Sequence, residues 1–146
     1  MSTSTDLLEG LARLVHAGGA FVFRPEGVYL PGEAPITFGS LHGSASPALC
    51  LTEYTPAESR TRAAHALIQA RVRAPSYLAG VRLGDELRGL LHDLSYLSLG
   101  AVRVSKITRI STAHLGPDSS GRHEWAHNFQ LLYTRSVTPS KETTHA

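Results

Sequence analysis

Residues 64–73, AHALIQARVR, constrain the fold more than any other part of the sequence. Alanine and aliphatic side chains alternate there with polar ones, a period of two that is typical of a β-strand with one buried face. Pro75 ends the strand, because proline cannot donate a hydrogen bond to a sheet. Residues 77–94 then carry leucines at helical spacing, so the strand leads directly into an amphipathic helix. The leucines of this stripe are Leu83, Leu87, Leu90, Leu91 and Leu94.

Three glycines interrupt the predicted helix, at positions 80, 84 and 89. Each of them weakens a helix interior by up to about 1 kcal/mol relative to alanine. The helix must therefore be supported by a tertiary surface.

Other segments add a second helix and further strands. Residues 6–17 carry an apolar helical stripe that ends at Gly18 and Gly19. Short apolar or alternating segments predict strands at 21–24, 48–54 and 101–111, and a last strand begins near His123. Ile107 is out of phase with Val102 and Val104, which indicates a β-bulge or a second buried face. The loop 113–122 joins the last two strands as a long hairpin.

Runs of neighbouring strands favour an antiparallel sheet, and two amphipathic helices can cover one face of such a sheet. We therefore predict an α+β fold, a two-layer sandwich in which a mainly antiparallel sheet of about four to five strands carries two helices packed on one face. One domain spans residues 1–137, and the polar residues 138–146 form a disordered C-terminal tail.

Residues 25–47 interrupt the regular elements with four prolines and four glycines. Proline and glycine disfavour a long helix or strand, yet the segment is too apolar for a flexible linker. We predict a protruding arm that is mobile in the free monomer and acts in assembly by packing on a partner. A loop folded onto its own domain is the alternative. The apolar residues of the arm are Val28, Tyr29, Leu30, Ile36, Phe38 and Leu41.

Residues 123–127, HEWAH, match the H-E-x-x-H signature of zinc proteases, which requires a helix to bring both histidines to one metal ion. Here the aromatic residues alternate from Trp125 onward, which predicts a strand with a largely buried Trp125. On a strand, His123 and His127 are separated by roughly 13 Å, whereas zinc–nitrogen bonds are about 2 Å long. We therefore predict a strand without a metal ion.

Composition and motifs offer little chemistry. The sequence has a net charge of +2 and a single cysteine, Cys50, and it lacks the glycine-rich phosphate-binding motifs and the G-x-S-x-G motif. Nine basic and three acidic residues lie between Arg60 and Arg109, which indicates either a face for phosphate or an acidic partner, or simply a solvated strand face. We predict a protein that is not an enzyme and has no catalytic residues, no cofactor and no metal site.

The order of elements resembles the tail terminator proteins of long-tailed bacteriophages, also known as minor capsid or tail completion proteins. The resemblance covers about residues 6–136. It rests on the leading helix with LLEGLARLV, on the arm RPEGVYLPGEAPITFGSLHGSASPALCLTEY, and on the strand and helix ALIQARVRAPSYLAGVRLGDELRGLLHDL. The return strand of the final hairpin, GRHEWAHNFQLLY, completes the pattern.

The resemblance implies a structural virion protein, assembled in the host cytoplasm, that forms a ring with a hexamer as the expected state. The ring sits at the head-proximal end of the tail tube, stops tube polymerisation and offers a surface for head–tail joining. Its implied partners are further copies of itself, the tail tube protein and a head completion or neck protein. Viral DNA passes through the lumen without specific binding.

Two groups of residues are candidates for the contacts of such a ring. Arg71 and Arg73 lie on the polar face of their strand and are candidates for a subunit interface or the lumen. The candidates for a subunit or tube interface lie in the arm: Tyr29, Leu30, Ile36, Phe38 and Leu41. A head–tail connector or neck protein of related fold is the alternative function, and a zinc-dependent hydrolase that uses HEWAH is a more distant one.

Overall fold

In the computed structural model, residues 2–56 and 64–134 are described, and this part of the chain forms two helices and six strands. The helices are α1 (Thr3–Ala17) and α2 (Tyr77–Leu91). The strands are β1 (Ile36–Phe38), β2 (Ala48–Glu53), β3 (His65–Ala74), β4 (Ser95–Leu99), β5 (Val102–Pro117) and β6 (His123–Thr134). None of the described helices has the length and apolar character needed to cross a membrane.

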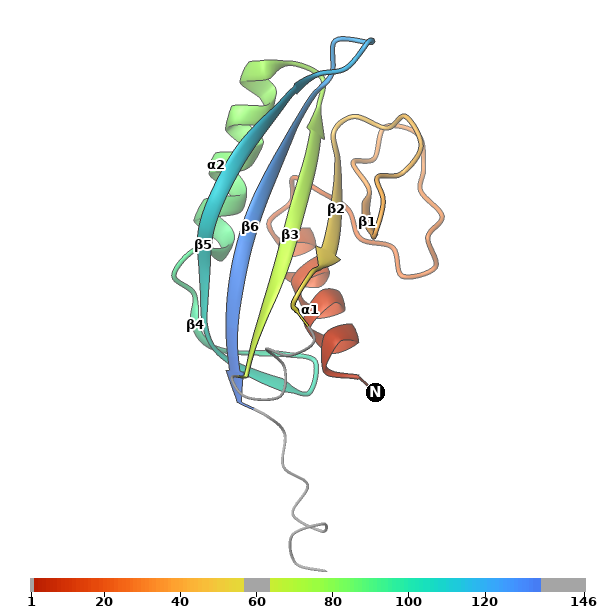
Figure 1. Ribbon diagram of the computed structural model, residues 1–146. Coiled ribbons are helices and arrows are strands. Elements are labelled where there is room, and N and C mark those ends of the chain that lie inside the picture. Colours follow the sequence, from red (N-terminus) through yellow and green to blue (C-terminus); the bar gives the residue numbers. More distant parts are fainter. Residues whose placement is uncertain (1, 57–63, 135–146) are drawn as a thin grey trace, which may run out of the picture.

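All six strands join one sheet in the order β1-β2-β3-β6-β5-β4. Every pairing is antiparallel except that of β1 with β2, which is parallel. The long strands β3, β6 and β5 form the centre of the sheet, and the helices lie behind it in Figure 1. The central register pairs Ala70 with His127 and Ala113 with Ala126.

The α+β class is confirmed, but the predicted two-layer sandwich and the predicted strand count do not match the structure exactly. The sheet has six strands in the described residues, and it curls around the helices (Figure 1). The two short edge strands account for the difference, because β1 has three residues and β4 has five, too few for a clear period. Residues 21–24, predicted as a strand, form only an isolated bridge between Val22 and Pro35. The predicted tail, 138–146, lies outside the described residues.

One apolar core lies between the helices and the sheet. The alternation predicted for β3 is confirmed, because Ile68 and Val72 are buried while Arg71 is exposed. Ser2 and Ser76 cap the two helices by accepting hydrogen bonds from the backbone amides of Thr5 and Ala79. The largest fully buried side chains are Phe21, Phe129, Leu7, Leu11, Ile36, Leu49, Leu51, Ile68, Leu87, Leu91, Ile107 and Leu131.

Strand β5 is longer than predicted and is bulged at three places. The register with β6 shifts between Val104 and Lys106, so Ile107 also faces the core, where it is fully buried. The predicted bulge is therefore confirmed. Two more shifts follow around Ile110 and Leu115, and the strand continues to Pro117. The connection to β6 is correspondingly short.

Candidate assembly surface

The HEWAH segment lies at the start of β6, so the predicted strand is confirmed. Trp125 and His127 both point toward α2 and meet its glycines, Trp125 against Gly80 and His127 against Gly84. Four helical residues rise about 6 Å and two strand residues about 6.7 Å, so the two pairs come into register when helix and strand run side by side. The glycines that weaken the helix therefore allow it to approach β6 closely.

Trp125 sits in a cluster of aromatic rings. Its side chain is only 6% exposed, which confirms the predicted burial. The ring lies 4.6 Å from that of His114 and 5.5 Å from that of Tyr77, measured between centroids. His123 lies beside this cluster and forms a 3.0 Å hydrogen bond between its Nδ1 and the Nε2 of His114.

The two histidines of HEWAH thus have different partners. His123 contacts His114, whereas the Nδ1 of His127 lies 2.8 Å from the hydroxyl of Thr112. Within residues 2–56 and 64–134, no group of three or more histidine, cysteine or acidic side chains has a geometry that could hold a metal ion. The strand conformation removes the premise of the zinc-protease motif, which is a helix.

His127 is buried next to a cationic side chain. Its ring is 2% exposed, and Nη1 of Arg109 lies 3.5 Å from its Nδ1. Burial, and secondly the charge of Arg109, lower the pKa of His127 to about 4. Nδ1 has two neighbours, the hydroxyl of Thr112 and the guanidinium of Arg109, whereas Nε2 has no partner among the described residues. A neutral His127 is therefore part of the folded state.

Protonation of His127 should destabilise the protein as the pH falls. The unfolded chain takes up the proton near pH 6.5, whereas the folded chain does so only near pH 4. The contribution of His127 is therefore complete above pH 6.5 and is lost between pH 6.5 and 4, with a loss of about 2 kcal/mol between pH 7 and 5. Urea unfolding at both pH values measures it, and His127→Gln should show a smaller loss. An equal loss in both proteins would contradict this assignment.

The arm, residues 25–47, is anchored to its own domain at both ends. Near its start, Nε of Arg24 donates a 2.9 Å hydrogen bond to Glu33, and the amide of Leu30 donates to the same carboxylate. These two hydrogen bonds lower the pKa of Glu33 to about 2. The hydroxyl of Tyr29 accepts from the amide of Arg24 and donates to the carbonyl of Ile36. The arm therefore has a defined shape in a single chain.

Arg73 fixes the other end of the arm. It is 7% exposed, and its guanidinium donates hydrogen bonds to the carbonyl oxygens of Ala45 and Gly43, each 2.8 Å long, and to that of His42. Arg71 lies two residues earlier on the same strand, pairs with Glu124 at 2.6 Å and remains partly exposed. Of these two candidates, only Arg71 has an accessible guanidinium in the single chain.

Replacing Arg73 by methionine should loosen the arm. The change removes three charge-assisted hydrogen bonds that hold residues 42–45 to β3, so we expect a loss of about 1–3 kcal/mol in the free energy of unfolding. Amide hydrogen exchange in residues 42–45 should also become faster. Arg71→Met is the matched control, because it removes only a solvent-exposed ion pair and should cost under about 1 kcal/mol. Equal effects of the two substitutions would contradict the anchoring role of Arg73.

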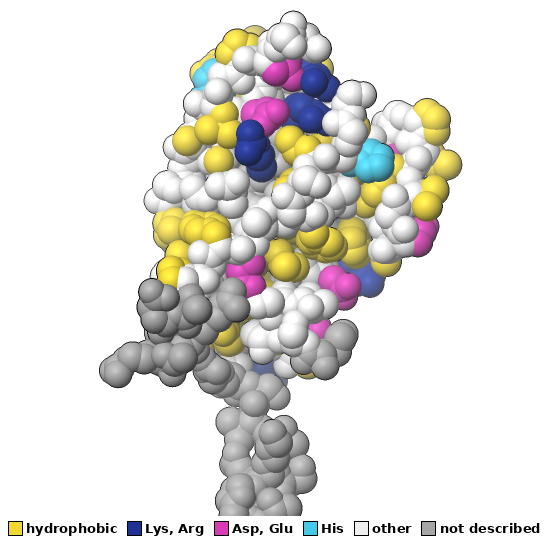
Figure 2. All heavy atoms as spheres, turned by 45° about the vertical axis from the view of Figure 1, so that its right-hand side comes forward, with side chains coloured by type: hydrophobic (Ala, Val, Ile, Leu, Met, Phe, Trp, Pro, Cys, Tyr) yellow, Lys and Arg dark blue, Asp and Glu magenta, His cyan; other side chains and the backbone are white. Residues whose placement is uncertain are grey.

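The arm residues predicted as an interface have different roles in the single chain. Ile36 is fully buried in the core of its own domain. Tyr29 is half-buried, and its hydroxyl donates a hydrogen bond to the carbonyl of Ile36, so both residues contribute to the folded single chain. Ile36 therefore lies in the core of the single chain rather than on an outer surface, and the role of the arm in assembly stays a prediction. Phe38 is 39% exposed and packs edge-on against Phe23. Leu30 and Leu41 stay predictions, and Figure 2 shows hydrophobic side chains along the outer rim of the arm.

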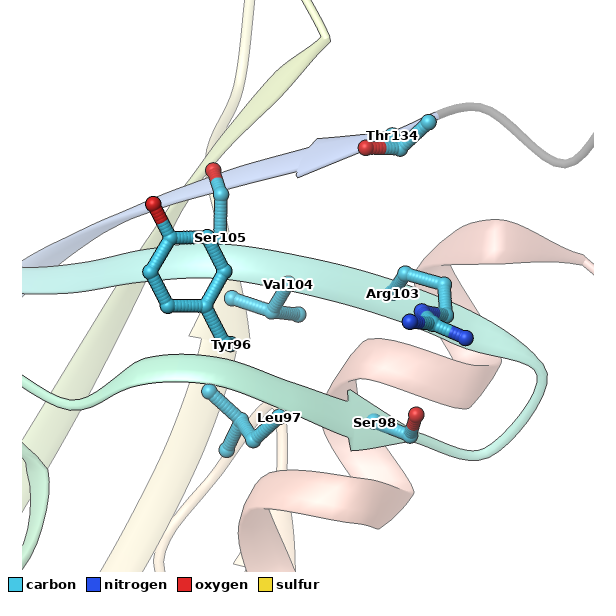
Figure 3. A pocket seen from close by; sticks show the side chains of 7 residues that line it. All are labelled: Tyr96, Leu97, Ser98, Arg103, Val104, Ser105 and Thr134. Atoms are coloured by element: carbon cyan, nitrogen blue, oxygen red, sulfur yellow. The ribbon is translucent and has the colours of Figure 1, made fainter.

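Two places with exposed apolar or aromatic side chains were not predicted from the sequence. One lies where α2 meets the edge of β5, around Leu78, Val81 and Ile110. The sequence does show that Leu78 and Val81 lie off the leucine stripe of the helix. It does not show that these residues lie beside Ile110 of β5. The other is the single side chain of Tyr96, which is 89% exposed beside a pocket of about 190 Å³ with mainly polar lining residues (Figure 3). The pocket is lined by Tyr96, Leu97, Ser98, Arg103, Val104, Ser105 and Thr134.

Comparisons with known proteins concern the fold alone. No protein family model matches the sequence, and no curated protein matches it. A chain in the solved virion of a native gene transfer agent particle has a similar fold, with a TM-score of 0.54 and 15% identity over 84% of this chain and 83% of that one. A second solved chain, which has no descriptive name, aligns with a TM-score of 0.58 and 12% identity over 94% of this chain and 99% of that one.

Proposed function

We infer that this chain is a structural virion protein that forms a closed ring of identical subunits, six in number, at the head-proximal end of a tail tube. The ring stops tube polymerisation on one face and offers its other face to a head completion or neck protein. The observation that supports this most is the likeness in fold, over most of both chains, to a component of a gene transfer agent virion.

The surface of the chain is compatible with such a role. Exposed apolar side chains occur on the arm, on the outer side of α2 and along β5, which are surfaces that copies of the chain can bury. The net charge of +2 is small. A small charge suits a lumen through which DNA slides, because each contact with a DNA phosphate adds salt-dependent affinity for the DNA and would hold it back.

Electron microscopy with tail tubes of the cognate virion tests this function. The purified chain, added to growing tubes, should form rings on one end only and should stop further lengthening. Tubes that grow to the same length as without the chain and that carry no ring at either end would contradict this function. If the chain then binds portal-side neck proteins, the connector function is supported instead.

A further inference from the structure

We propose that the tip of the arm of one copy docks where α2 meets β5 on the next copy, so that the ring closes head to tail. The arm tip consists of Glu26, Val28 and Leu30, and the receiving surface, here called the α2–β5 patch, consists of Leu78, Val81, Arg109 and Ile110. This contact rests on the proposed ring and specifies which surfaces build it.

The α2–β5 patch is open and apolar. Leu78 is 64% exposed, Val81 36% and Ile110 51%. Val81 and Arg109 line a pocket of about 200 Å³ between helix and strand, with Trp125 also in its wall. The pairing of β4 with β5 ends at Lys106, and no further strand follows β4 in the described sheet, so β5 forms its edge from Ile110 onward.

The bulges of β5 decide how a partner can bind at this edge. The register shift between Arg109 and Ser111 makes Ile110 an extra residue in the strand. Bulges interrupt the regular spacing of backbone groups, and they are one way in which edge strands avoid pairing with other strands. A partner is therefore expected to dock by side chains on the patch rather than by adding a long strand.

The arm tip is shaped for such docking. Val28 is 67% exposed and Leu30 is 59% exposed, while Tyr29 between them points inward and bonds the carbonyl of Ile36. The ion pair of Arg24 with Glu33 holds the same loop. Because the loop is already ordered, docking loses little conformational entropy.

The arm tip and the α2–β5 patch lie on opposite sides of one molecule. In Figure 1 the arm projects beyond β1 and β2, whereas α2 and β5 lie at the other end of the sheet. One chain therefore cannot join its own two surfaces, but a second copy can. A contact between two different surfaces is heterologous, and repeated copies of it close into a ring when the rotation fits.

Charge complements the apolar match. Glu26 is exposed and Arg109 half-buried, and neither forms an ion pair within the described residues. Asp85 lines the same pocket as Arg109 but lies outside ion-pair distance of it. Glu26, Val28 and Leu30 are all exposed on one short loop, so all three can contact one partner. A carboxylate beside two aliphatic side chains matches an arginine beside Val81 and Ile110.

A charge swap in the full chain tests the contact by the concentration at which rings assemble. Glu26→Arg and Arg109→Glu should each weaken assembly by roughly tenfold or more, because each places like charges together. The double variant should restore most of the loss. Leu30→Asp should also weaken assembly, and it changes only an exposed side chain of the arm.

Each outcome has one meaning. Rings that assemble unchanged in Glu26→Arg and Leu30→Asp would overturn this contact and leave the ring itself intact. A wild-type chain that stays monomeric would overturn both the contact and the proposed function. Arg109→Glu also changes the surroundings of His127 and could lower the melting temperature. In that case Ile110→Asp is the variant to use in its place. Undiminished assembly of Ile110→Asp would also overturn the contact.

Discussion

Replacing Trp125 by alanine should lower the free energy of unfolding by about 3–5 kcal/mol, the usual cost of removing a buried aromatic side chain. Trp125 is 6% exposed, and its six-membered ring lies against the backbone of Gly80. The adjacent backbone of α2 cannot collapse into the space, because the helix is held elsewhere by Leu87 and Leu91. A chemical unfolding curve measures the loss.

Leu132→Ala is the control on the same strand. Leu132 is 42% exposed, so its loss should cost only about 1 kcal/mol. A cost below about 0.5 kcal/mol for Trp125→Ala would place Trp125 at the surface, where substitutions are that mild.

Gly80→Ala should destabilise the protein, whereas Gly89→Ala in the same helix should stabilise it. A Cβ atom at position 80 would lie 1.8 Å from the Trp125 ring, so the ring or the helix must move, at a cost of about 1–3 kcal/mol. A Cβ atom at position 89 meets nothing within 4 Å, and alanine there gains about 0.5–1 kcal/mol from helix propensity. Thermal melts of the two variants should therefore shift in opposite directions.

A double substitution links these two predictions. In a Trp125→Ala background the clash is gone, so adding Gly80→Ala should be neutral or stabilising rather than destabilising. Gly80→Ala with the same cost in both backgrounds would show that the contact with Trp125 is not the reason for the glycine.

Elements with a clear period were predictable from the sequence. In β3 and in β6, apolar side chains that face the core alternate with polar side chains that face solvent. This alternation can be seen within a few neighbouring residues of the sequence. The leucine stripe of α2 is equally local, and two of its members, Leu87 and Leu91, are buried. Ile107 is out of phase with Val102 and Val104, and this correctly indicated a bulge before it. A bulge inserts one extra residue, so the side chains that follow it change faces.

Features that depend on distant contacts were not predictable. The five residues of β4 have no period, and tertiary pairing with β5 alone makes them a strand. Arg73 was expected on a solvated face, but the loop 42–45 folds over it and accepts its hydrogen bonds. Likewise, the glycines of α2 weaken the helix when read locally, and only the position of Trp125 explains Gly80.

Native mass spectrometry of the full-length chain, at concentrations from nanomolar to tens of micromolar, measures most directly whether copies of it close into a ring. A closed ring predicts one dominant species at six times the monomer mass, without a ladder of larger species, because every interface is used. A monomer at every concentration, or an open series of oligomers that grows with concentration, would contradict the ring.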